Sequence, residues 1–135
     1  MRSYSINEVV GSDYGVVRGV AVFFKRSDFA KVPNPMTFVF IDVHEDYLDY
    51  CFFGMDPGWD NNGQKWLHVP AGRHGGRCVL SYQDGSAEIH RWRDARTLQP
   101  VTGVYQASNV TKAVPGSADW RYLIDRFTFY TPPLF

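Results

Sequence analysis

The residues best suited to chemistry in this 135-residue chain follow one strongly apolar segment. Asp42, His44 and Asp46 alternate in Asp42-Val43-His44-Glu45-Asp46, so they would share one side if an extended strand continued through them. Carboxylate oxygens and an imidazole nitrogen could together bind a divalent cation, and the carboxylate oxygens are ligands of the type that calcium takes. The other interpretation is a polar strand end that runs into a turn, and we favour it because the spacing is not diagnostic of a metal site.

Two further polar residues, His74 and Asp84, could join Asp42 and His44 in a metal-dependent hydrolase. Such a centre needs about three protein ligands and one open coordination position. The sequence contains none of the spacings HExxH, GxSxG, GxxxxGK[ST], GxGxxG or CxxC. We therefore predict no catalytic residue and no cofactor, and keep the hydrolase as an alternative.

Aromatic residues are abundant, with 4 Trp, 8 Tyr and 10 Phe. Trp59, Trp66 and Trp92 could form a platform that stacks on a carbohydrate, which gives a second alternative, a ligand-binding β module. The favoured interpretation is that the rings fill the core of a small β-rich domain.

The composition limits the class of protein. Hydrophobic residues make up 44% and charged residues 21%, so we expect residues 1–135 to form one domain with its own core. The 14 Lys and Arg balance the 14 Asp and Glu, so the drive to bind nucleic acid or an anionic membrane is missing. The sequence shows neither an apolar stretch long enough to span a membrane nor a signal peptide. Cys51 and Cys78 fit either one disulfide or two thiols.

Turn residues divide the chain into expected strands. Residues 37–43 form the strongest one, with Phe38, Phe40 and Asp42 on one face and apolar residues on the other, so we expect a central strand covered on both sides. Weaker strands are expected over residues 3–10, 19–25 and 51–55. A helix capped by Ser117 or Asp119 is expected near the C-terminus. The expected class is mainly β (α+β), antiparallel and rich in hairpins.

The clearest hairpin covers residues 77–92. Asp84-Gly85 suits a two-residue type I′ turn, which pairs Tyr82 with Ala87 and Leu80 with Ile89. This register predicts that Glu88, His90 and Trp92 lie on the polar face, opposite Cys78, Leu80 and Tyr82.

Several blocks of the sequence follow one another in a recognisable order. His74 precedes Asp84-Gly85 by nine intervening residues. The other blocks are Phe23-Phe24-Lys25-Arg26-Ser27-Asp28-Phe29, Phe38 to Asp46 (FVFIDVHED), Asp84 to Trp92 (DGSAEIHRW) and Asp119-Trp120-Arg121-Tyr122-Leu123. In these blocks the chain resembles the globular part of the prepilin-type, type II secretion-like pseudopilins of the Planctomycetes and Verrucomicrobia group. Val43 and Ser86 depart from that family, which has Glu and His there.

This resemblance implies a pilin-like head without the family's N-terminal helix and leader. The implied function is a non-enzymatic structural subunit of a bacterial secretion or cell-surface filament system, located outside the cytoplasm. The implied partners are other pilin-like subunits, further copies of the chain, secreted cargo or a glycan, and the membrane would be reached only through the missing helix. His74, Asp84 and Gly85 would be framework residues, with His74 bonded to the Asp84 turn or to nearby backbone.

Overall fold

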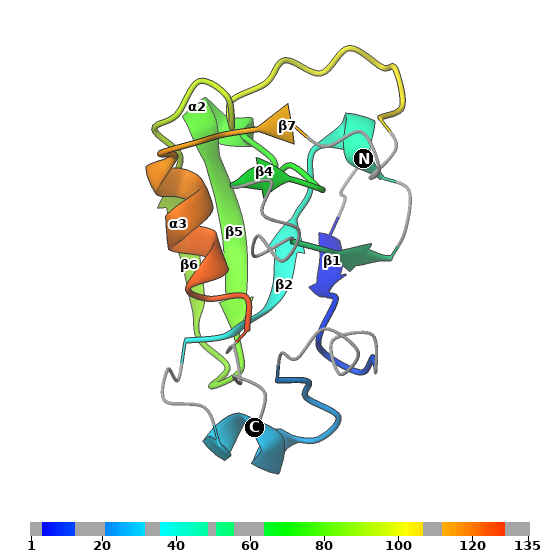
Figure 1. Cartoon of the computed structure of the whole chain (residues 1–135), viewed down its shortest axis with the longest axis vertical. Coiled ribbons are helices and arrows are strands. Elements are labelled where there is room, and N and C mark those ends of the chain that lie inside the picture. Colours follow the sequence, from blue (N-terminus) through cyan, green and yellow to red (C-terminus); the bar gives the residue numbers. More distant parts are fainter. Residues whose placement is uncertain are drawn as a thin grey trace.

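A computed structural model describes residues 4–12, 21–31, 36–48, 51–55, 64–106 and 112–128 (Figure 1). Its main element is a five-stranded sheet of order β3-β1-β2-β5-β6, accompanied by a two-stranded sheet, β4-β7. The strands are β1 (Tyr4–Asn7), β2 (Phe38–Asp42), β3 (Phe52–Phe53), β4 (Lys65–Trp66), β5 (Arg77–Tyr82), β6 (Ala87–Arg91) and β7 (Lys112–Ala113). The helical segments are η1 (Arg26–Lys31), η2 (Glu45–Tyr47), the single turn α2 (Arg73–Gly76) and α3 (Ala118–Ile124). The expected β-rich α+β class with a short helix near the C-terminus is confirmed.

The sheet is mixed, which corrects one detail of the expectation. β1 pairs with β2, β2 with β5 and β5 with β6 in antiparallel fashion, but β3 runs parallel to β1. The predicted strand over residues 19–25 is not formed in its described part. Phe23 makes only an isolated bridge to Val10, and η1 begins at Arg26.

A β-bulge in β2 changes which of its side chains enter the core. Phe38 pairs with Tyr82, but Phe40 pairs with Ser81, so β2 has one extra residue between them. Phe38 and Ile41 are therefore both fully buried, whereas Phe40 is 47% exposed. The strand is central, as expected, but the prediction that it is covered on both faces is wrong.

The hairpin register is shifted by one residue from the predicted register. Tyr82 N–H donates to Ser86 C=O, and Gly85 N–H donates to Tyr82 C=O, with Gly85 at φ +89°. These bonds define a three-residue loop with a left-handed glycine rather than a two-residue type I′ turn. Leu80 consequently pairs with Glu88, and Val79 pairs with Ile89. A slip of one residue exchanges the faces, so Ile89 is exposed and Trp92 is buried.

The core lies between one face of the five-stranded sheet and the elements α3, β4 and β7, which lie in front of that sheet in Figure 1. Ser117 is the N-cap of α3 and accepts from Trp120 N–H at 3.2 Å. Trp120 Nε1 donates to the carbonyl oxygen of Lys65, which joins α3 to β4. We name the opposite face of the sheet, which carries Tyr4, Phe40 and Ile89, the outer face. It is open to solvent at these three residues.

Both cysteines are free thiols, with Cys51 exposed and Cys78 buried. Burial raises the pKa of the Cys78 thiol, so this residue behaves as a small apolar side chain. Among the described residues, none of the helices is long and apolar enough to cross a membrane.

Candidate functional site

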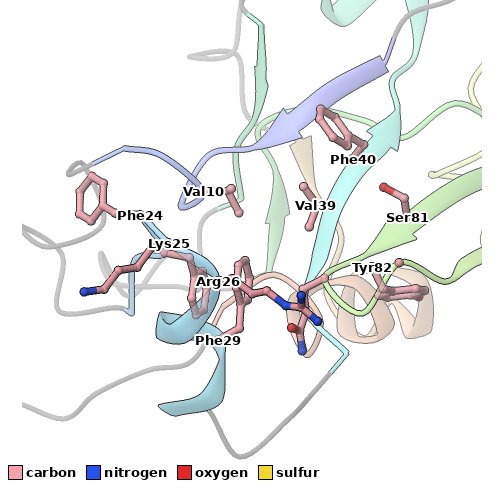
Figure 2. Close-up of a pocket in the computed structure, with 12 residues that line it drawn as sticks. Val10, Phe24, Lys25, Arg26, Phe29, Val39, Phe40, Ser81 and Tyr82 are labelled. Carbon is pink, nitrogen blue, oxygen red and sulfur yellow. The ribbon is translucent and has the colours of Figure 1, made fainter.

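One cavity among the described residues is a groove between η1 and the strands β2 and β5, with a volume of about 430 Å³ (Figure 2). We call it the η1 groove. One wall comes from the segment that leads into η1. Asp28 Oδ2 accepts from the backbone N–H groups of Phe24 and Lys25, which fixes this turn. Phe23 and Phe29 stack with ring centroids 4.3 Å apart, and together they form an apolar base.

The other wall belongs to the sheet. The bulge in β2 places both Val39 and Phe40 against the groove, and Ser81 and Tyr82 contribute from β5. Figure 2 shows these four residues on the two strands beside the η1 segment. Gly85 of the hairpin loop completes the lining. The bulge is therefore what opens apolar surface toward η1.

The charged side chains that line the η1 groove are cationic. Lys25 and Arg26 are exposed and line it, beside Phe24, whose side chain is 61% exposed. Histidines, cysteines and carboxylates are missing from the described residues that line it. This composition suits the binding of an apolar segment that carries a negative charge, because the rings bury apolar surface and the cations attract the charge.

The three residues named as metal candidates form hydrogen bonds with three different parts of the chain. Arg73 donates to Asp42 Oδ1 at 2.6 Å and to Glu45 Oε1 at 2.7 Å. His44 Nδ1 accepts from Asp46 N–H, and His44 Nε2 lies 3.0 Å from the carbonyl oxygen of Gln99, so both ring nitrogens are occupied. Among the described residues, groups of three or more His, Cys, Asp or Glu that could hold a metal ion are not found.

Asp46 has a structural partner of its own. Its carboxylate accepts from Thr102 N–H at 2.9 Å, from the Thr102 hydroxyl at 2.7 Å and from Gly103 N–H at 2.9 Å. The bond from Thr102 N–H is the largest influence that lowers the pKa of Asp46. The carboxylate therefore stays ionised and holds the loop around Thr102.

His74 and Asp84 lie at opposite ends of β5. The six residues of β5 separate them by roughly 20 Å, so they cannot bond to each other or act on one substrate atom. The expected bond between His74 and the Asp84 turn is therefore wrong. His74 is exposed and adopts the left-handed conformation, with φ 54°. Asp84 instead accepts from Ser86 N–H and from the Ser86 hydroxyl, which lowers the pKa of Asp84.

The tryptophan platform does not form from the described residues. Trp66 is fully buried, and Trp92 is buried with its Nε1 donating to the carbonyl oxygen of Ala71. Neither ring is available to stack on a sugar. Trp59 lies outside the described residues.

One polar cluster was missed by the sequence analysis because it depends on the shifted hairpin register. Glu88 accepts from the hydroxyls of Tyr82 and Tyr122, and it pairs with His90 Nδ1 at 3.0 Å. The His90 ring stacks on the Tyr122 ring, and the guanidinium of Arg126 lies 3.6 Å from the centroid of the Tyr122 ring. These contacts connect the hairpin to α3, so we assign them a structural role.

The η1 groove was also not predicted from the sequence, although the block Phe23 to Phe29, which supplies one of its walls, was singled out as part of the family resemblance. The aromatic and basic run Phe23 to Arg26, followed by Asp28 as a hydrogen-bond acceptor, is a local signal for a fixed turn with exposed cations. Nothing local indicates that the bulge in β2 turns Val39 and Phe40 toward this segment.

No protein-family model, curated protein or solved structure matches the chain.

Proposed function

We propose that this chain is a non-enzymatic structural headpiece that docks an apolar segment of a partner subunit, flanked by carboxylates, in the η1 groove. The observation that carries the proposal is the pairing of exposed rings with two exposed cations around one cavity of about 430 Å³. Isolated exposed apolar residues are ordinary, but several around one groove are typical of an interaction site. The cations favour a partner with the opposite charge.

The arrangement of the ionisable groups supports binding over catalysis. The Asp42 carboxylate accepts a hydrogen bond from Arg73, and those of Asp46 and Glu88 each accept two or more from other parts of the chain. A catalytic acid or base needs its titrating atom within reach of a substrate in a cleft. Here the η1 groove is lined by rings and cations. Asp46 lines a separate cavity of about 240 Å³, where its carboxylate is bonded to Thr102 and Gly103.

The specific form that we propose is the head of a pilin-like subunit in a secretion or cell-surface filament, located outside the cytoplasm. Its support is the ordered series of sequence blocks that resembles the pseudopilins, together with the β-rich fold. The partner segment would then belong to another pilin-like subunit. Burial of Trp66 and Trp92 disfavours the carbohydrate-binding alternative, and the separation of His74 from Asp84 disfavours the four-residue hydrolase site.

The proposal can be tested by nuclear magnetic resonance with two synthetic peptides. Both have the same Leu- and Phe-containing centre, flanked by Glu in one peptide and by Lys in the other. We expect the Glu peptide to shift the resonances of Phe24, Phe29 and Phe40 in a saturable manner, while Ile89 on the same outer face is unaffected. Equal binding of both peptides, or shifts spread over the whole surface, would contradict the proposal. Titration with laminarin and with Ca²⁺ examines the two alternatives under the same conditions.

A further inference from the structure

β6 is an edge strand with one side of its backbone open. Among the described residues, the sheet order ends at β6, and β6 pairs with β5 alone. The ladder between them starts with Tyr82 N–H donating to Ser86 C=O and ends with Trp92 N–H donating to Gly76 C=O. Because backbone groups alternate along an antiparallel strand, the even-numbered residues bond to β5. The amides and carbonyls of Ala87, Ile89 and Arg91 therefore face the free edge.

This edge is accessible to a partner. The side chains of Ala87, Ile89 and Arg91 are all exposed, and that of Ile89 is 72% exposed. Among the described residues, the backbone groups of these three have no hydrogen-bond partner beyond the sheet itself. A β-bulge and a proline, which commonly protect edge strands, are both missing from residues 87–91.

We propose that two copies of the chain associate through β6, with the strands antiparallel around a two-fold axis at Ile89. In this register Ile89 faces Ile89 of the second copy, and Ala87 faces Arg91. Ala87, Ile89 and Arg91 of the two copies then exchange about six backbone hydrogen bonds between the two β6 strands. The two five-stranded sheets become one continuous sheet.

The sequence of β6 is complementary to itself in this register. Glu88 faces His90 of the second copy, and the two Arg91 side chains lie at opposite ends of the pairing, so no like charges meet. The two Ile89 side chains meet on the outer face beside Val79, the partner of Ile89 within each hairpin. An antiparallel pair of identical strands forms a closed interface of this kind and leaves no further edge at β6.

This inference deepens the proposed function because it names a second copy as a partner of the headpiece, and it rests on the proposal that the domain acts by packing. The experiments are separable, since the η1 groove lies at β2, β5 and η1, whereas the new contact involves only the free edge of β6. Loss of groove binding with an intact dimer would reject the proposed function alone.

The test is sedimentation velocity of the full chain with substitutions on the outer face. We expect the wild type to form a dimer at tens of micromolar. Ile89→Lys places two cations opposite each other at the axis and should raise the dissociation constant at least about tenfold. Tyr4→Lys, on the same face but three strands away on β1, should leave the dimer intact. A wild type that stays monomeric, or a dimer that Ile89→Lys does not weaken, would overturn the proposal.

A cysteine cross-link tests the register itself. In a Cys51→Ser background, Ile89→Cys should form a disulfide between copies on mild oxidation, because the Cα atoms of facing residues lie about 5.5 Å apart. Ala87→Cys alone should not cross-link, but Ala87→Cys combined with Arg91→Cys should. Cross-linking of Ala87→Cys to itself, or none by Ile89→Cys, would overturn the proposed register. Binding of an unrelated extended peptide to a monomeric chain would identify the edge as a peptide site and would also overturn the proposal.

Discussion

The side-chain amide of Asn7 donates to the carbonyl oxygen of Phe127 at 2.7 Å, across 120 residues of sequence. The same Nδ2 atom also donates to the carbonyl oxygen of Phe38 at 2.9 Å, and Oδ1 accepts from Val9 N–H. Asn7 is fully buried, so these three bonds use most of the capacity of its amide group. One side chain thus joins β1 and β2 to the segment that follows α3.

Substitution of Asn7 should therefore be costly. We expect Asn7→Ala to lower the free energy of unfolding by about 3 kcal/mol, because two buried carbonyl oxygens and one buried amide lose their partner. Chemical denaturation measures this loss. Ser27→Ala, at an exposed position on η1, is the control and should change the free energy by less than about 0.5 kcal/mol. A loss below about 1 kcal/mol for Asn7→Ala would show that water replaces the three bonds.

The hairpin shows how far local sequence determines the structure. Asp84-Gly85 correctly marks the turn, and the apolar alternation correctly marks both strands. A two-residue and a three-residue loop share this signal, because both need a glycine at positive φ. The choice depends on packing. The three-residue loop puts Trp92 in the core and Glu88 beside Tyr122, and these contacts are not visible in the local pattern.

The same reasoning explains why the lining of the η1 groove could not be predicted from the sequence. Strict alternation would place Phe38 and Phe40 on one face, and no residue type in β2 marks the bulge that separates them. Asp42 was correctly placed at the end of the strand. Its partner Arg73 comes from a turn 31 residues later, and this pairing is a tertiary property.

Gly85 provides a test of the observed loop. Its φ is +89°, and an added Cβ would meet no atom within 4 Å, so the cost of a side chain there is conformational only. We expect Gly85→Ala to lower the free energy of unfolding by about 1 kcal/mol and Gly85→Asn to lower it by less, since Asn tolerates this conformation better. Thermal unfolding of the two variants compares them. An Ala variant as stable as the wild type would argue for a loop without positive φ.

The Glu88 cluster predicts resistance of two tyrosines to alkaline ionisation. Burial raises the pKa of Tyr82 and of Tyr122, and the bond to Glu88 raises the pKa of both further. The folded state therefore holds these protons where the unfolded state releases them, so this stabilisation is present below pH 10 and is lost as the pH rises above it. Spectrophotometric titration should show the two tyrosines ionising above the ordinary range of a tyrosine hydroxyl.

Replacement of Glu88 checks the cause of this resistance. Glu88→Gln removes the negative charge but keeps one acceptor oxygen, so the pKa of Tyr122 should fall toward its ordinary value. The pKa of Glu88 itself is informative. Desolvation raises it, but the bonds from Tyr122, Tyr82 and His90 outweigh this effect and lower it overall. An unchanged tyrosine titration in Glu88→Gln would contradict the role assigned to the cluster.

Acid stability should depend in part on Asp94. Hydrogen bonds from the Arg96 side chain are the main cause that lowers the pKa of Asp94 from 3.8 to about 2. A lowered pKa stabilises the folded state above the ordinary pKa, and this contribution is lost as the pH falls from 3.8 to about 2. Asp94→Asn should thus be less stable than the wild type at pH 7, and the difference should shrink by pH 2. Because Arg96 is 44% exposed, high salt should reduce the difference as well. A constant difference from pH 7 to pH 2 would be inconsistent with this assignment.

The most direct test of the headpiece account is a charge exchange between the η1 groove and its peptide, measured by calorimetry. Wild type is compared with the double variant Lys25→Glu, Arg26→Glu, each with the Glu-flanked and the Lys-flanked peptide. We predict that the wild type prefers the Glu peptide, that the double variant prefers the Lys peptide, and that Phe40→Asp weakens both. Peptide preference that does not change with the groove charges would contradict the claim that this groove is where the protein meets its partner.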